Sequence, residues 1–373
     1  MSRVGTAVAL VAVLPSLASG AQWTVVPQLG LTADTDTNRR LENPPRPSDG
    51  LMLSGLLAIT RMTEVSTLAL TPRGSVNRYS GDDVLDSGDW GVDTMYRRTG
   101  ERATFDVQGG MSDDSTLITE PGETGFVEAN TRRHALQAST SMTHFLGSRH
   151  LLRYQVGISD IDYDRTLGTG LVGYRYPSID VLYAATLSPR LDLTLTANAA
   201  RLEVPLTHVE TDTRGVQAGF RFRVSERFDL ETRVGRTNTQ ARGRSDVAQS
   251  YFAQAAWHNE RSNLELTLSQ DIQPSGNGIL VHADDLRLAY SFKLTERLTL
   301  DASARASLRE DTQVDLRRYE YRYGAALLAL SWNLDEAWTV GVAGSYVRQE
   351  YEFFHSDADG HRVGFNVAWR PRQ

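Results

Sequence analysis

The sequence of 373 residues contains no cysteine. Disulfide bonds, thiolate metal sites, cysteine nucleophiles and lipid attachment to an N-terminal cysteine are therefore excluded. Lysine is almost absent as well, since Lys293 is the single lysine among 39 basic residues. The 46 acidic residues outnumber the basic ones and give a net charge of −7, which argues against a general nucleic-acid-binding protein.

Long apolar runs are missing after the first 21 residues. A membrane-spanning helix needs roughly 20 mostly apolar residues, and every apolar stretch downstream of Ala21 is interrupted before that length. The mean hydropathy of −0.36 agrees with this. Apolar residues at helical spacing are scarce too. The sequence therefore excludes a helical membrane protein.

The first 21 residues have the three-part layout of a secretory signal peptide. Arg3 supplies the positive charge, residues 4–14 form a short apolar core, and Pro15 ends it before a run of small residues. The sequence thus predicts a cleaved signal peptide over residues 1–21 and a single mature domain over residues 22–373. The mature protein is expected to leave the cytoplasm.

Strict alternation of apolar and polar residues recurs in the mature chain. In residues 263–271, for example, Leu264, Leu266 and Leu268 alternate with polar residues, and residues 190–199 follow the same pattern. Because successive side chains of a β-strand point to opposite faces, each such segment predicts a strand with one apolar and one polar face.

The connectors between these segments alternate between short and long. The short ones are residues 61–65, 99–101, 146–149, 188–190, 225–227, 258–262, 295–297 and 334–337. The long, polar ones are residues 34–49, 77–85, 112–130, 164–172, 204–212, 239–247, 272–282, 309–318 and 351–359. Eight short and nine long connectors join about 18 strands, with 16–18 as the range.

This pattern predicts an all-β fold, a closed antiparallel transmembrane β-barrel with short periplasmic turns and long extracellular loops. A sheet in lipid must close on itself, because lipid offers its backbone no hydrogen bonds. A soluble β-sandwich is the alternative, and it would bury the apolar faces against each other. Trp23, Trp332, Trp338 and Trp369 fall at the predicted short-turn end, as in an interfacial aromatic belt. Pro177 falls inside a predicted strand and calls for a bulge or a strand that extends beyond the membrane.

Two segments carry a resemblance to a known group. Residues 362–369, RVGFNVAW, resemble the C-terminal signal by which the barrel assembly machinery recognises its clients, although the chain continues for four residues. The mature N-terminus resembles proteobacterial outer-membrane β-barrel proteins of the porin-like group in Trp23, Pro27, Leu29, Asp36, Asn38 and Leu41. Some members of that group are linked to exopolysaccharide production. The resemblance implies an outer-membrane location, with outer-membrane lipid, lipopolysaccharide and the assembly machinery as partners.

Charged residues on the polar strand faces are the candidate functional residues. They are Asp192, Arg221, Arg223, Glu231, Arg233, Glu265, Arg287, Asp301 and Arg305. An arginine at the lipid midplane costs about 2–4 kcal/mol, so these side chains should line a wet lumen. Mixed charges facing one another would filter small ions and sugars. The alternative is a lumen filled by salt bridges, without conduction.

No motif in the sequence predicts catalysis, a cofactor or a metal. The leading hypothesis is an outer-membrane, porin-like barrel that passes or helps to export small polar or saccharide solutes. One alternative is an outer-membrane enzyme, for which His355, Asp357 and Asp359 form the candidate cluster in the last outer loop, with paired acids such as Asp284 and Asp285 at the rim. Another is a non-conducting scaffold of a polysaccharide secretion system.

Overall fold

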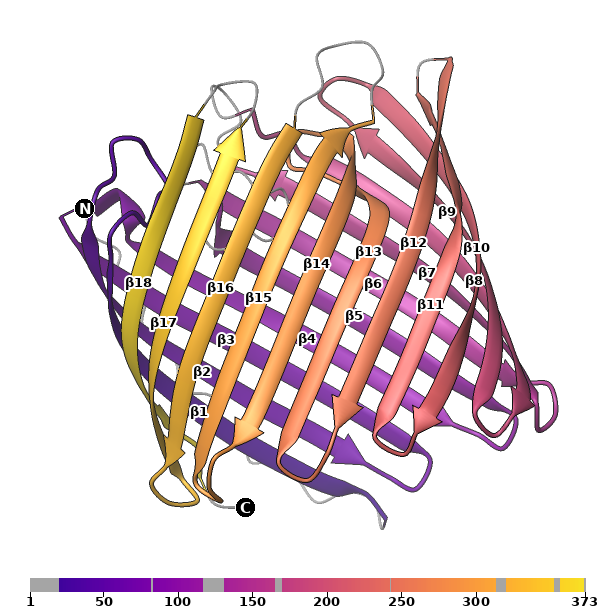
Figure 1. The fold of residues 1–373 in the computed structure, drawn as a ribbon, viewed down its shortest axis with the longest axis horizontal. Coiled ribbons are helices and arrows are strands. Elements are labelled where there is room, and N and C mark those ends of the chain that lie inside the picture. The colour runs from indigo at the N-terminus through magenta and orange to yellow at the C-terminus, as the bar shows by residue number, and fades with distance from the viewer. Residues whose placement is uncertain are drawn as a thin grey trace.

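A computed structural model describes residues 20–81, 83–116, 131–164, 170–241, 243–312, 320–351 and 356–371. These residues form 18 β-strands around a barrel (Figure 1) and one 3₁₀ turn, Asp83–Leu85. The strands are β1 Gln22–Asp36, β2 Ser48–Met62, β3 Ser66–Ser80, β4 Ser87–Thr99, β5 Ala103–Ser115, β6 Arg132–Phe145, β7 His150–Tyr163, β8 Tyr174–Ser188, β9 Leu191–Val204, β10 Val209–Ser225, β11 Phe228–Ala241, β12 Arg244–His258, β13 Ser262–Pro274, β14 Leu280–Lys293, β15 Leu298–Asp311, β16 Glu320–Asn333, β17 Trp338–Tyr351 and β18 Ser356–Trp369. Among the residues described, no helix is long and apolar enough to cross a membrane. The predicted signal peptide falls almost wholly on residues 1–19, outside the described ones.

Every strand pairs antiparallel with its sequence neighbours, and the sheet closes because β1 pairs with both β2 and β18. The prediction of a closed antiparallel barrel of about 18 strands is confirmed. The eight predicted short turns all lie at the lower end of the barrel in Figure 1. Closure provides hydrogen-bond partners for the backbone within the membrane-spanning part of the sheet.

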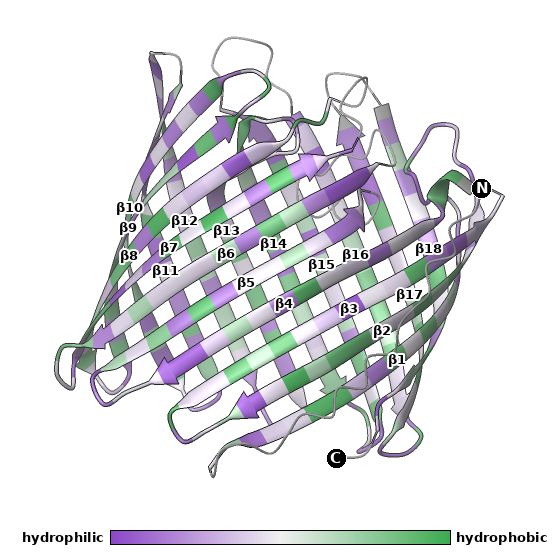
Figure 2. Cartoon of the chain, turned by 180° about the vertical axis from the view of Figure 1, so that it is seen from behind, coloured by the Kyte–Doolittle hydropathy of each residue, from purple (hydrophilic) through white to green (hydrophobic). Residues whose placement is uncertain are grey.

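The outer face of the barrel is apolar. Hydrophobic and hydrophilic residues alternate along the strands (Figure 2). Large apolar side chains remain about half exposed on strand after strand, for example Leu29 on β1, Leu53 on β2 and Val216 on β10. A soluble sandwich would bury these faces against each other, whereas lipid covers them in a transmembrane barrel. The exposed faces therefore contradict the sandwich alternative.

Tryptophans gather at the short-turn end, as predicted. Trp23 is near the start of β1, Trp338 begins β17, Trp332 is near the end of β16 and Trp369 ends β18. Trp257, one residue before the end of β12, lies at the same end and was not included in the sequence prediction. Indole rings prefer the boundary between lipid and water, so these residues mark the periplasmic interface.

Pro177 interrupts the β8–β9 ladder without a bulge. Around Pro177, pairing is absent between the pair Arg175–Glu203 and the pair Ser178–Ala200, and the register is the same on both sides; the register shift of this ladder lies farther along, between Thr186 and Ser188. Because proline has no N–H group, two residues of β8 are left unpaired with β9. The register does not shift, so side chains on both sides of Pro177 keep their inward or outward orientation. Of the two alternatives that the sequence offered at this position, the bulge is wrong.

Several predicted long connectors are shorter in the structure, because the strands continue into them. Residues 204–212, 239–247 and 351–359 were predicted as loops, but the gaps between strands are 205–208, 242–243 and 352–355. Most strands have 13–15 residues, more than the roughly 9–11 that a tilted strand needs to span a membrane. The polar residues that were predicted to form loops thus extend the strands beyond the apolar band of the barrel. Ion pairs such as Arg201–Asp212, at 2.7 Å, join neighbouring extensions on the outer face.

Candidate functional site

The nine charged residues predicted as functional lie on the strand face opposite the apolar one, which is the inner face of the barrel. Arg221 and Arg223 on β10 alternate with the half-exposed Phe220 and Phe222. Asp192 on β9 alternates with outward leucines in the same way. The remaining six residues follow the same rule on their strands: Glu231, Arg233, Glu265, Arg287, Asp301 and Arg305.

The register brings five of the nine onto one hydrogen-bonded row, here called the charged row. It crosses seven strands from β9 to β15 through residues that lie directly opposite one another: Asp192, Arg221, Glu231, Gln254, Thr267, Arg287 and Arg305. Arg223, Arg233 and Glu265 lie two residues away from the row on their own strands. Neighbouring strands are about 4.8 Å apart, so the row forms a continuous polar band on the wall.

Acids and bases alternate in the part of the charged row near the short turns. The Arg221 guanidinium donates to Glu231 at 2.6 Å, and Arg233 lies 3.5 Å from the same carboxylate. Arg223 is 3.6 Å from Asp229. The side chains of Arg221 and Arg223 are more than 60% exposed, so these guanidiniums reach solvent inside the barrel even while they are paired.

Asp285 organises the other end of the charged row. Its carboxylate accepts from Arg305 at 2.8 Å and lies 3.5 Å from Arg287, and its side chain is only 7% exposed. One buried carboxylate thus holds two guanidiniums, which leaves an excess of positive charge at mid-height. The sequence prediction placed Asp285 in an outer loop, but the residue lies inside β14 and faces inward. Asp284, its neighbour, faces outward and accepts a hydrogen bond from the Tyr251 hydroxyl at 2.7 Å.

Two connectors meet across the extracellular mouth. The Val172 N–H, between β7 and β8, donates to the Gly276 carbonyl, between β13 and β14, at 2.8 Å. The Val172 side chain packs against a buried apolar cluster that includes Ile161, Leu171, Leu202 and Leu280. Because these hairpins are separated by strands β9–β12, the contact bridges the mouth above the beginning of the charged row. We call it the mouth bridge.

The two aspartates of the candidate catalytic cluster lie in a strand and face outward. Asp357 and Asp359 lie in β18, in the strand rather than in a loop, and they alternate with inward residues, so they face outward. Asp359 is 3.7 Å from His361, and Asp357 is 3.8 Å from Arg348. His355 lies outside the described residues. The described part of the chain contains no group of three or more His, Cys, Asp or Glu residues that could hold a metal ion.

Comparison with known proteins gives a likeness of fold. No protein-family model matches the sequence, and no curated protein does. Among solved structures, the outer membrane protein opdK from Pseudomonas aeruginosa has a TM-score of 0.52 at 11% identity, covering 93% of this chain and 99% of that one. OpdO from the same organism has a TM-score of 0.52 at 12% identity, covering 94% and 97%. OccK5 (OpdH), also from that organism, has a TM-score of 0.51 at 9% identity, covering 94% and 98%.

The likeness extends over almost the whole of each chain, so the entire barrel is shared and not only a part of it. At 9–12% identity it concerns the fold alone. Together with the outward apolar face and the tryptophan belt, it makes this protein an outer-membrane β-barrel in architecture. The exopolysaccharide link that the sequence resemblance implied has no counterpart among these structures.

Proposed function

We propose that this protein is an outer-membrane channel for small polar solutes, saccharides among them, and that the nine charged residues line its pore. The observation that carries the proposal is the exposure of arginines in the charged row and beside it. Arg221, Arg223 and Arg287 each keep about 60% or more of their side-chain surface accessible, although each is within 4 Å of a carboxylate. Guanidiniums in a lumen packed with protein would be covered.

Energetics favour the same function. Charges of both signs on one face of a membrane barrel require water next to them, because placing an arginine side chain in lipid at the bilayer midplane would destabilise the barrel by about 2–4 kcal/mol. A water-filled lumen with alternating charges across neighbouring strands conducts ions and admits hydrated solutes. The fold shared with the outer membrane protein opdK agrees with this function without indicating a solute.

The proposal includes the surroundings of the channel. The charged strand extensions on the outer face, such as Arg201 with Asp212 and Arg175 with Asp160, lie where lipopolysaccharide head groups would contact a barrel. Guanidinium groups bind phosphate through two parallel hydrogen bonds. Lipopolysaccharide is therefore the proposed lipid partner, and the barrel assembly machinery the proposed route of insertion.

The test is single-channel recording from the refolded mature protein in a planar bilayer, with liposome swelling in sugars of graded size beside it. The proposal expects discrete, stable openings in KCl and swelling rates that fall as the sugars become larger. A protein that is shown to be folded by its heat-modifiable gel mobility, yet gives neither openings nor swelling, would contradict it. The non-conducting scaffold would then be the better account.

A further inference from the structure

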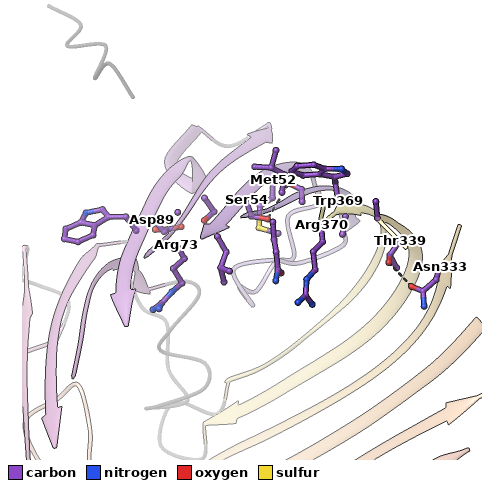
Figure 3. Close-up of a pocket in the computed structure, with 18 of the residues that line it drawn as sticks. Met52, Ser54, Arg73, Asp89, Asn333, Thr339, Trp369 and Arg370 are labelled. Carbon is purple, nitrogen blue, oxygen red and sulfur yellow. Dashed lines mark hydrogen bonds between the residues drawn. The ribbon is translucent and has the colours of Figure 1, made fainter. Parts of the chain in front are cut away.

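A second row on the inner wall differs from the charged row in chemistry. Seven residues lie directly opposite one another across strands β16, β17, β18, β1, β2, β3 and β4: Asn333, Thr339, Ala368, Gly30, Ser54, Ser75 and Asp89. All seven line one furrow of about 1100 Å³ (Figure 3). We call this set the neutral row, because only its last member, Asp89, carries a charge.

The furrow exists because the side chains of the neutral row are small. At Gly30 the wall is reduced to backbone, and a Cβ atom there would lie 2.7 Å from the Ser54 hydroxyl oxygen. That hydroxyl donates to the Gly30 carbonyl at 3.4 Å. Ala368 and Ser75 continue the shallow floor on either side. A run of small residues across adjacent strands thus hollows the wall into a groove.

The middle of the furrow suits hydroxyl groups, whereas charged residues line its two ends: Arg297, Asp335, Glu336 and Arg370 at the short-turn end and Asp114 at the opposite end. Thr339 donates to the Asn333 side-chain carbonyl at 2.8 Å, and Ser54 and Ser75 add hydroxyls farther along. Leu56 lines the furrow beside them and offers an apolar surface. Arg73 also borders the furrow, but its charge is paired with Asp93. Neutral donors and acceptors beside apolar surface match a sugar ring, which has hydroxyls at its edge and C–H groups on its faces.

The length of the furrow suits an extended ligand. Neighbouring strands are about 4.8 Å apart, so the six steps of the neutral row span about 29 Å. Asn333 ends β16 at the short-turn end and Asp89 lies near the start of β4 at the opposite end, so the row climbs the wall of tilted strands as it crosses them. One step is similar to the length of one pyranose unit, so successive sugars of a chain would meet successive strands.

We infer that the neutral row is the track along which a neutral oligosaccharide binds and moves through the barrel, while the charged row on β9–β15 serves ions. This inference rests on the proposed channel function and names a solute class and a path for it. The chain would lie along the wall formed by β16–β18 and β1–β4, with its ring faces on Leu56 and its hydroxyls on the Ser, Thr and Asn side chains.

The experiment compares two serine variants that add the same volume to the inner face. Ser54→Leu fills the furrow, whereas Ser303→Leu adds a leucine on β15, outside the furrow and beside the charged row. Block of the KCl current by maltohexaose is measured in planar bilayers for the original protein and both variants. The inference expects the sugar concentration for half-block to rise about tenfold or more in Ser54→Leu, equivalent to about 1.4 kcal/mol. It expects less than about a twofold change in Ser303→Leu.

The failure of this inference is distinct from the failure of the channel function. A protein that conducts KCl but is not blocked by maltohexaose would overturn the inference and leave the channel intact. Equal weakening in both variants, or weakening only in Ser303→Leu, would overturn it as well. A folded protein without any KCl conductance would remove the channel function itself, and the inference with it.

Discussion

Leu29 of β1 lies opposite Trp369 of β18, and this is the last residue pair that joins the two ends of the sheet. Beyond this pair, both chain segments have a proline at the second position: Pro27 precedes Leu29 by two residues, and Pro371 follows Trp369 by two. Proline has no N–H group and cannot donate a ladder hydrogen bond. The barrel therefore closes over eight pairs, and residues 22–28 of β1 pair with β2 alone.

The end of this seam can be tested with proline. The Thr37 N–H donates to the His361 carbonyl at 3.0 Å, and alternate residues of a strand point the same way, so the Leu29 N–H faces β18. Leu29→Pro should lower the free energy of unfolding by about 1–3 kcal/mol, because it leaves a carbonyl without its donor. The measurement is the temperature at which the compact band is lost on an SDS gel. Pro27→Leu is the control and should leave this temperature unchanged; a drop in Leu29→Pro no larger than the change in the control would contradict the role given to the Leu29 N–H group.

The mouth bridge predicts a change in conductance. Gly278 has a φ of +70°, and a Cβ atom there would lie 2.4 Å from a methyl carbon of Val172. Gly278→Ala should push the two connectors apart and raise the single-channel conductance. Gly243→Ala is the matched control, because Gly243 has a similar φ of +78° but, apart from its chain neighbours, no described residue has an atom within 4 Å of the added carbon. If both variants conduct alike, the bridge does not narrow the path.

Asp285 predicts a stability effect that depends on burial. Asp285→Asn removes the carboxylate that holds Arg287 and Arg305; because Arg305 is largely covered while Arg287 remains exposed to water, the loss should be about 1–3 kcal/mol. The free energy of unfolding in detergent should fall by that order. Asp301→Asn removes the same charge from the same wall at a less buried position and should cost under about 1 kcal/mol. Similar losses for both variants would contradict the role given to Asp285.

The tryptophan belt predicts a pattern of fluorescence quenching. Trp23, Trp257, Trp332, Trp338 and Trp369 lie at the short-turn end of the barrel. In liposomes of brominated lipid, bromine near the head group should quench the emission more strongly than bromine at the chain terminus. Stronger quenching from the bilayer centre would show that the apolar band is positioned differently.

The alternation of residues was sufficient to predict the strands, their two faces and closure. Leu264, Leu266 and Leu268 show why. If the pairing register of their strand shifted by one residue, all three side chains would move from lipid to the water-facing side, so only one orientation of the strand is stable. In the structure all nine charged residues lie on the strand face opposite the apolar one. Strand ends were predicted less well, because hydrated strand extensions and loops have the same polar composition.

Which residues lie side by side in the charged row and in the neutral row could not be predicted from the sequence. That Gly30 lies beside Ser54 and Ala368 depends on the register of each strand pair, which is set by the turns and by the stagger around the closed barrel. No local pattern marks Ser54 as different from other small inward residues. The pairing of Asp285 with Arg305 depends on register in the same way. The face on which a side chain lies can be predicted from the sequence of its own strand. Its height in the barrel relative to residues on other strands depends on the register of all 18 strands.

The most direct test of the account is the reversal potential across a KCl gradient for Arg221→Glu combined with Arg223→Glu. Both guanidiniums are exposed on the inner face of β10, so reversing them should shift the reversal potential toward cation selectivity. Arg214→Glu, on the outer face of the same strand, is the matched control and should leave the potential unchanged. An unchanged potential in the double variant, or an equal shift in the control, would contradict a water-filled pore lined by the charged row.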